Sequence, residues 1–139
     1  MLLTIVYFCG MKIKFFNPDS LDRNLKATVH KSGKLGFTVD AAKRLKLEPN
    51  KSAAIGTNED DPSDDSLYVI VYKEVRSGAF RIAKAGQYYY INLKALFDAL
   101  KINYKAESVV YDISEETIEN ETVFKFSRRK NTKKLNIEL

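Results

Sequence analysis

The sequence KSGKLGFTVDAAKRLKL, residues 31–47, joins a basic turn, a short strand and a short helix without a linker. Apolar and polar side chains alternate in residues 25–31 and again in residues 35–39, with a Ser-Gly pair between the two runs. This pattern is typical of a β-hairpin. Asp40 is then expected to cap a helix of about two turns, with Ala41, Ala42 and Leu45 on its apolar side.

A second stretch, AKAGQYYYINLKALFDALKI at residues 83–102, has the same order of turn, strand and helix. Apolar residues of its helix segment, residues 93–102, follow the i, i+3, i+4, i+7 spacing of an amphipathic helix. Each stretch is preceded by one strand-like run and followed by two more, with an acidic segment between those two. This recurrence predicts an internal duplication.

Individual positions of the two stretches correspond as well. Gly33 in the first turn corresponds to Gly86 in the second, and the triplet LKL at 45–47 corresponds to LKI at 100–102. The spacing from the turn glycine to the triplet is two residues longer in the second stretch, and the residue identity of the two stretches is low. The predicted duplication therefore depends on the order of elements.

We predict an α+β protein, mostly β, of two ββαββ repeats packed as a pseudo-symmetric barrel-like body with two short helices. The first unit spans residues 25–73 and the second spans residues 78–128, with the linker EVRSG at 74–78. Residues 1–24 form an N-terminal extension, for which a hairpin is an alternative, and residues 129–139 form a basic tail.

The net charge of +5 is unevenly distributed. Residues 59–65 and residues 112–121 hold five acidic residues each, and both segments are expected to be loops. The remainder of residues 1–124 holds 17 basic and 7 acidic residues, and residues 125–139 hold six basic residues and one acidic residue. This separation of charge favours a positive face on the molecule.

Cys9 and His30 are the only cysteine and the only histidine. They allow no internal disulfide and are too few for a zinc site. The sequence has no phosphate-binding glycine loop and no nucleophile elbow. The apolar run 2–9 is too short to span a bilayer and lacks the features of a signal peptide. We therefore expect a cytoplasmic protein that is not an enzyme, with no catalytic residues, no metal and no cofactor.

The segment FTVDAAKRLKLEPNKSAAIG, residues 37–56, resembles the AbrB/SpoVT-like swapped-hairpin domain. The likeness lies in an apolar-polar-apolar strand end, a short helix closing in Leu-x-Leu, and a turn near Asn50. It covers residues 25–73 and, more loosely, residues 78–128. Members of that family are dimeric bacterial DNA-binding regulators or antitoxins in which two units interlock their hairpins, so two copies in one chain would imply a pseudo-dimer.

The chain departs from that family at the hairpin turn and at the start of the helix. The family commonly has Gly-Arg after the turn and Pro before the helix, where this chain has Gly33-Lys34 and Thr38. A lysine at this position retains the charge for a phosphate contact. Gln87 in the second unit carries no charge, which puts direct DNA contact by that unit in doubt.

The same elements can be grouped in another way. Strand patterns at 52–57, 67–73, 78–84 and 87–92 precede the helix segment 93–102. Four strands followed by a helix are similar to the repeat of Whirly, Pur and positive-cofactor-four type single-strand binders. Which strands pair with each other decides between the two groupings.

Both resemblances imply nucleic-acid binding. Lysine and arginine side chains supply affinity by neutralising phosphates, and exposed aromatic rings stack on unpaired bases. The candidate nucleic-acid-binding residues are Lys26, Lys31, Lys34, Lys43, Arg44, Arg81, Lys84, Tyr88, Tyr90, Arg128, Arg129 and Lys130.

The expected function is that of an AbrB-like DNA-binding regulator of transcription, with DNA favoured over RNA as the partner. The alternatives are a Whirly- or Pur-like binder of single-stranded DNA or RNA, and a structural protein-interaction module. No membrane partner is expected, and a homo-oligomer is left open.

Overall fold

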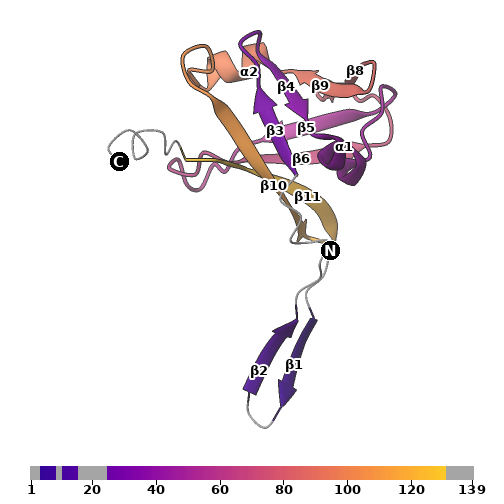
Figure 1. Cartoon of the computed structure of the whole chain (residues 1–139), viewed down its shortest axis with the longest axis vertical. Helices are drawn as coiled ribbons and strands as arrows, with labels where there is room; N and C mark the ends of the chain where they lie inside the picture. Colours follow the sequence, from indigo (N-terminus) through magenta and orange to yellow (C-terminus); the bar gives the residue numbers. More distant parts are fainter. Residues whose placement is uncertain (1–3, 9–10, 16–24, 131–139) are drawn as a thin grey trace.

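A computed structural model describes residues 4–8, 11–15 and 25–130 (Figure 1). The larger sheet consists of β3 (Lys26–Val29), β4 (Lys34–Phe37), β5 (Ser52–Gly56), β6 (Leu67–Tyr72), β7 (Phe80–Arg81), β8 (Ala83–Ala85), β9 (Tyr88–Asn92), β10 (Val109–Ile118) and β11 (Glu121–Arg128). The helices are α1 (Val39–Leu45) and α2 (Lys94–Ala99). The prediction of a mostly β protein with two short helices is confirmed.

The nine strands form one antiparallel sheet in the order β7-β5-β6-β11-β10-β3-β4-β9-β8. Its two edge strands, β7 and β8, are consecutive pieces of the segment 80–85, most of which falls within the single strand predicted at 78–84. Ile82 separates them, is only 3% exposed and donates its N–H to the carbonyl of Lys51 at 3.4 Å. The sheet therefore nearly closes on itself as a barrel.

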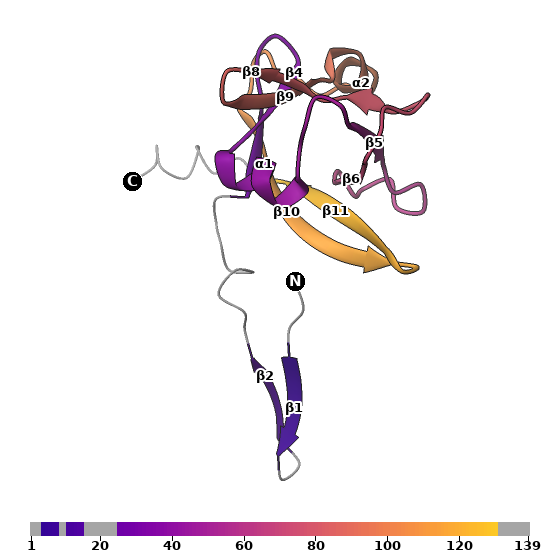
Figure 2. The same cartoon turned by 90° about the vertical axis from the view of Figure 1, so that its right-hand side faces the viewer.

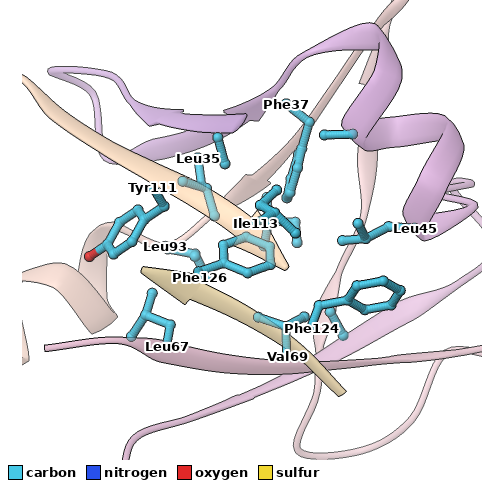
Figure 3. Close-up of a cluster of buried hydrophobic side chains, with 14 of the residues drawn as sticks. Leu35, Phe37, Leu45, Leu67, Val69, Leu93, Tyr111, Ile113, Phe124 and Phe126 are labelled. Carbon is cyan, nitrogen blue, oxygen red and sulfur yellow. The ribbon is translucent and has the colours of Figure 1, made fainter. Parts of the chain in front are cut away.

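Alternating side chains of the strands fill the interior of the barrel (Figure 3). Phe37, Tyr111 and Phe126 form the aromatic centre, with ring centroids 6.0 Å apart between the two phenylalanines. A barrel of about this size has an interior that side chains can fill. The hydroxyl of Tyr111 is buried there without a hydrogen-bond partner in the described structure, which is an unfavourable contribution to stability.

Helix α1 begins two residues earlier than an N-cap at Asp40 predicts. Thr38 is the N-cap, and its Oγ1 accepts a hydrogen bond from the Ala41 N–H at 3.3 Å. Asp40 instead lies in the first turn, where a carboxylate interacts favourably with the helix dipole. The predicted apolar side of this helix is confirmed, since Ala41, Ala42 and Leu45 are buried.

Helix α2 is shorter than the predicted range 93–102. It ends at Ala99, and Phe97 is its only buried residue. The chain leaves the helix at Lys101, whose φ is 58°, a value that ends helical geometry. Leu100 therefore falls outside the helix and is 38% exposed.

Both helices end in the same way. Lys46 has a φ of 55° and Lys101 has a φ of 58°. The next N–H in each case reaches back five residues, from Leu47 to Ala42 at 3.0 Å and from Ile102 to Phe97 at 3.0 Å. These hydrogen bonds satisfy carbonyl groups at the helix ends.

The second acidic segment, residues 112–121, is not the loop that its charge predicted. β10 continues through it to Ile118, and β11 starts at Glu121 (Figure 2). Glu119 and Asn120, with φ of 50° and 65°, make a two-residue turn with positive φ at both positions. Such turns match the twist of a hairpin, so cross-strand pairing continues despite the like charges.

The first acidic segment, residues 59–65, does lie in a loop, between β5 and β6. Asp64 organises its end by accepting hydrogen bonds from the Ser66 N–H at 3.0 Å and the Tyr68 hydroxyl at 2.6 Å. These hydrogen bonds hold the pKa of the Asp64 carboxyl well below its usual range, and the bond from Tyr68 has the largest effect.

Residues 4–8 and 11–15 pair as an antiparallel hairpin of β1 (Thr4–Phe8) and β2 (Met11–Phe15). Neither strand pairs with the nine-stranded sheet within the described part of the chain. The rest of the N-terminal extension and residues 131–139 of the basic tail lie outside the described residues. None of the helices described is long and apolar enough to cross a membrane.

Candidate nucleic-acid interface

The outer face of β3, β4 and β9 carries the densest group of predicted site residues. β4 pairs with β3 on one side and with β9 on the other. Inward-pointing residues of the three strands, including Val29, Leu35 and Ile91, are buried in the core. The alternate positions therefore point outward. This group, called the outer face below, comprises Lys26, Thr28, His30, Lys34, Gly36, Tyr88 and Tyr90.

Two tyrosines stack on the outer face. The rings of Tyr88 and Tyr90 have centroids 6.0 Å apart and an interplanar angle of 23°. Tyr88 is 37% exposed, and Tyr90 is half-buried. Stacked aromatic rings outside a barrel leave ring surface available to a further planar group.

Gly36 allows Tyr88 to lie against the sheet. A Cβ at this position would collide with the Tyr88 phenol and would lie 2.7 Å from Nε2 of His30. The Tyr88 hydroxyl and His30 Nε2 are hydrogen-bonded across this glycine, and the rings meet edge-on with centroids 5.8 Å apart. Gly36 is thus required for close approach of a side chain.

Burial raises the pKa of the Tyr88 phenol. The phenol therefore stays protonated at neutral pH and shares a hydrogen bond with Nε2 of His30. This hydrogen bond joins β9 to the end of β3 and restricts the rotamers of both rings. The aromatic pair is consequently ordered before any ligand binds.

Three lysines lie on the outer face or in the turn that adjoins it. Lys34 Nζ lies 4.7 Å from the centroid of the Tyr90 ring, within cation–π range. Lys26 is a half-buried residue of β3, and Lys31 is exposed in the turn between β3 and β4. Within the described residues none of these lysines forms an ion pair, so their charges are available to an anionic partner.

Three of the predicted arginines are paired with carboxylates. Arg44 lies 3.9 Å from Glu115, and Arg128 lies 3.1 Å from Glu107. Arg129 forms two hydrogen bonds with Asp112, and this contact raises the pKa of its guanidinium. Their charges are therefore partly neutralised in the free protein.

The remaining predicted residues lie on other parts of the barrel. Lys43 is exposed on α1, Arg81 is exposed on β7, and Lys130 follows the end of β11. Lys84 is opposite Tyr89 in the β8–β9 register, which places it on the other face from Tyr88 and Tyr90. The structure does not bring these four residues to the outer face.

Three outer-face residues, Thr28, His30 and Gly36, were not among the predicted site residues. Sequence alternation placed His30 on the same side as Lys26, which was a usable signal for its position. Gly36 gave no such signal, because its role depends on Tyr88, a residue distant in the sequence. No group of three or more metal-ligating side chains occurs among the residues described.

The chain was compared with models of protein families, with curated proteins and with solved structures. None of the three comparisons gives a match.

Proposed function

We propose that this protein is a non-enzymatic nucleic-acid-binding protein that contacts its partner through the outer face. One observation carries the proposal: the Tyr88–Tyr90 stack lies on the same face as Lys26 and Lys34 and beside the turn that holds Lys31, and these three lysines form no ion pairs in the described structure. Ammonium groups neutralise phosphates, and ring faces contact bases or sugars.

The strand pairing supports a duplicated, AbrB-like fold. The hairpin β3–β4 has a counterpart in β8–β9, and β5–β6 has one in β10–β11. The first strand of each unit pairs with the third strand of the other, as β3 with β10 and β7 with β5. This exchange and the matching helix ends favour two interlocked ββαββ units, 25–73 and 78–128. We therefore infer a DNA-binding regulator that acts in the cytoplasm.

A single-strand binder is the second candidate, because the Tyr88–Tyr90 stack suits unpaired bases. The pairing disfavours the fold of that candidate. β6 lies between β5 and β11 and not beside β7, so the four consecutive strands do not form one meander. The aromatic stack on the outer face favours binding to single strands. The strand pairing favours an AbrB-like fold and therefore duplex DNA. A direct comparison of the two oligonucleotide types distinguishes these candidates.

Fluorescence anisotropy with matched single-stranded and duplex oligonucleotides, at low and physiological salt, tests the proposal. We expect salt-sensitive binding that weakens for all sequences in Lys31→Ala/Lys34→Ala. Two lost phosphate contacts should reduce the slope of log K against log salt by about 1.4–1.8.

The matched control is Lys73→Ala/Lys105→Ala, which removes the same charge from two exposed positions outside β3, β4, β9 and the turns that join them. It should bind almost as tightly as the wild type. An equal loss in both double variants would indicate non-specific attraction to net charge. No binding of the wild type to either oligonucleotide would overturn the proposal and would favour a protein-interaction module.

A further inference from the structure

A cavity of about 380 Å³ lies between α1 and the turn that joins β8 to β9. Tyr89 and Gln87 line it from the turn, and Val39, Lys43, Lys46 and Leu47 line it from the helix side. Tyr89 points to the opposite side of β9 from Tyr88 and Tyr90. The cavity therefore shares no residue with the outer face.

The barrel is less tightly closed at the end near α1 than at the end near α2, and this leaves the cavity open to solvent. Val39, the first residue of α1, is 62% exposed. Gly86, in the neighbouring turn, has no atom within 4 Å of the place where a Cβ would stand. The chain leaves this space unfilled although Val39 and Leu47 supply apolar walls.

The lining combines three kinds of recognition chemistry. The ring of Tyr89 and the side chain of Val39 offer flat apolar surface, and Lys84 Nζ lies 5.2 Å from the centroid of that ring. Lys43 and Lys46 bring ammonium groups, against a single carboxylate, Glu48. The amide of Gln87 both donates and accepts hydrogen bonds.

We propose that this cavity binds a nucleoside monophosphate. The base would stack on Tyr89, Gln87 would contact the edge of the base, and the phosphate would lie between Lys43 and Lys46. An aliphatic acid would use the lysines and the apolar wall but would leave the amide and the ring face without a matching group. The volume is within the range of small-ligand sites. The proposal does not depend on nucleic-acid binding by the outer face.

Isothermal titration calorimetry of the full chain with the four ribonucleoside 5′-monophosphates tests this proposal. Unphosphorylated nucleosides and inorganic phosphate serve as partial ligands, and both should bind at least tenfold more weakly than the best monophosphate. Equal affinity for inorganic phosphate would overturn the proposal, because the cavity would then bind an anion only. Absence of binding by all four monophosphates would also overturn it.

Two variants locate the site. Val39→Asp places a carboxylate at the cavity and, in the first turn of a helix, also suits the helix dipole, so folding should be retained. It should weaken monophosphate binding about tenfold. Lys46→Gly removes an ammonium group at a φ of 55°, which glycine adopts freely, and should weaken binding severalfold.

The matched control, Lys101→Gly, makes the same change at the end of α2 and should leave monophosphate affinity unchanged. Unchanged affinity in Val39→Asp and Lys46→Gly would overturn the assignment. Lys31→Ala/Lys34→Ala should retain monophosphate binding. Failure of the outer-face proposal can therefore be distinguished from failure of the cavity proposal. Weaker binding of a single-stranded oligonucleotide by Val39→Asp would show that the cavity takes a nucleotide that is part of a strand. An effect on monophosphates alone would show that the cavity takes a free nucleotide.

Discussion

The two ends of the barrel are built from the same elements and differ in closure. At one end the β3–β4 turn rests on the start of α2: the Gly33 carbonyl accepts a hydrogen bond from the Leu93 N–H at 3.0 Å, and Leu93 is fully buried. At the other end the β8–β9 turn stands away from the start of α1, and Val39 is 62% exposed.

Turn length accounts for part of this difference. Three residues, 31–33, connect the hydrogen-bonded residues His30 and Lys34, whereas two residues, Gly86 and Gln87, connect the paired Ala85 and Tyr88. The longer turn reaches the neighbouring helix, and the shorter turn does not. One additional turn residue thus contributes to the difference between the two ends. One end is sealed and stabilises the fold, and the other is open and holds an aromatic and basic cavity.

Replacement of the turn glycines should give the largest contrast. Gly33 has a φ of 90°, and an added Cβ would lie 2.7 Å from the Lys94 Cα. Gly33→Ala should therefore lower the free energy of unfolding by about 3 kcal/mol or more, from backbone strain and the collision. Gly86→Ala, at a φ of 62° in open space, should lower it by about 1 kcal/mol. Urea denaturation measures both, and equal losses would contradict the closure of one end only.

Truncation of the two residues at the helix starts should give a contrast of comparable size. Leu93→Ala removes a side chain with no exposed surface and should cost about 2–5 kcal/mol. Val39→Ala removes an exposed side chain and should change stability by less than about 0.5 kcal/mol. Thermal unfolding of both variants checks this, and a large loss in Val39→Ala would show that Val39 packs more closely than its exposure indicates.

Glycine substitutions at the C-terminal ends of the two helices should change stability equally, because both ends have the same backbone conformation. Lys46 and Lys101 both have a left-handed backbone, with φ of 55° and 58°. Glycine relieves that strain but gains more freedom in the unfolded chain, so Lys46→Gly and Lys101→Gly should each stabilise by about 0.5 kcal/mol. Denaturation midpoints measure the two effects. A difference above about 1 kcal/mol would weaken the proposed equivalence of the two units.

The smallest effect is expected in the pH dependence at the α2 end. Hydrogen bonds from Lys94 and Tyr104 lower the pKa of Asp98 below its ordinary value. A carboxylate with a lowered folded pKa stabilises the fold above the unfolded pKa and loses that contribution as pH falls through the folded pKa. Melting temperatures between about pH 5 and pH 2 should therefore fall less steeply in Asp98→Asn than in the wild type. Parallel curves would show that these exposed contacts do not contribute.

Features that depend on local sequence were predictable. Alternation separated the buried Ile91 from Tyr90 on the other side of β9, and the helix pattern identified the buried face of α1. The break at Ile82 was not predictable, because it depends on the Lys51 carbonyl and on closure of the barrel. The run of acidic residues at 112–121 indicates a loop, whereas a favourable turn at Glu119 and Asn120 keeps the strands paired through most of this segment.

Only the part of the candidate site that follows from strand alternation was predictable from the sequence. Lys26, Lys34, Tyr88 and Tyr90 share a face because strand periodicity places them there. The ion pairs of the three arginines with Glu107, Asp112 and Glu115 join residues distant in the chain, and nothing in the local pattern indicates them. The alignment of turn and helix that leaves the cavity at Tyr89 is likewise a tertiary property.

The exchange of strands also bears on how the chain is synthesised. Ala27 in β3 pairs with Phe37 in the adjacent β4 on one side and with Tyr111 in β10 on the other, so the second edge of β3 finds its partner only after most of the chain has left the ribosome. Until then the edge of the β3–β4 hairpin is unpaired and offers a template for other chains. Such non-local pairing slows folding, and slow folding prolongs this exposure. The growing chain is therefore most vulnerable to aggregation before residues 109–118 emerge.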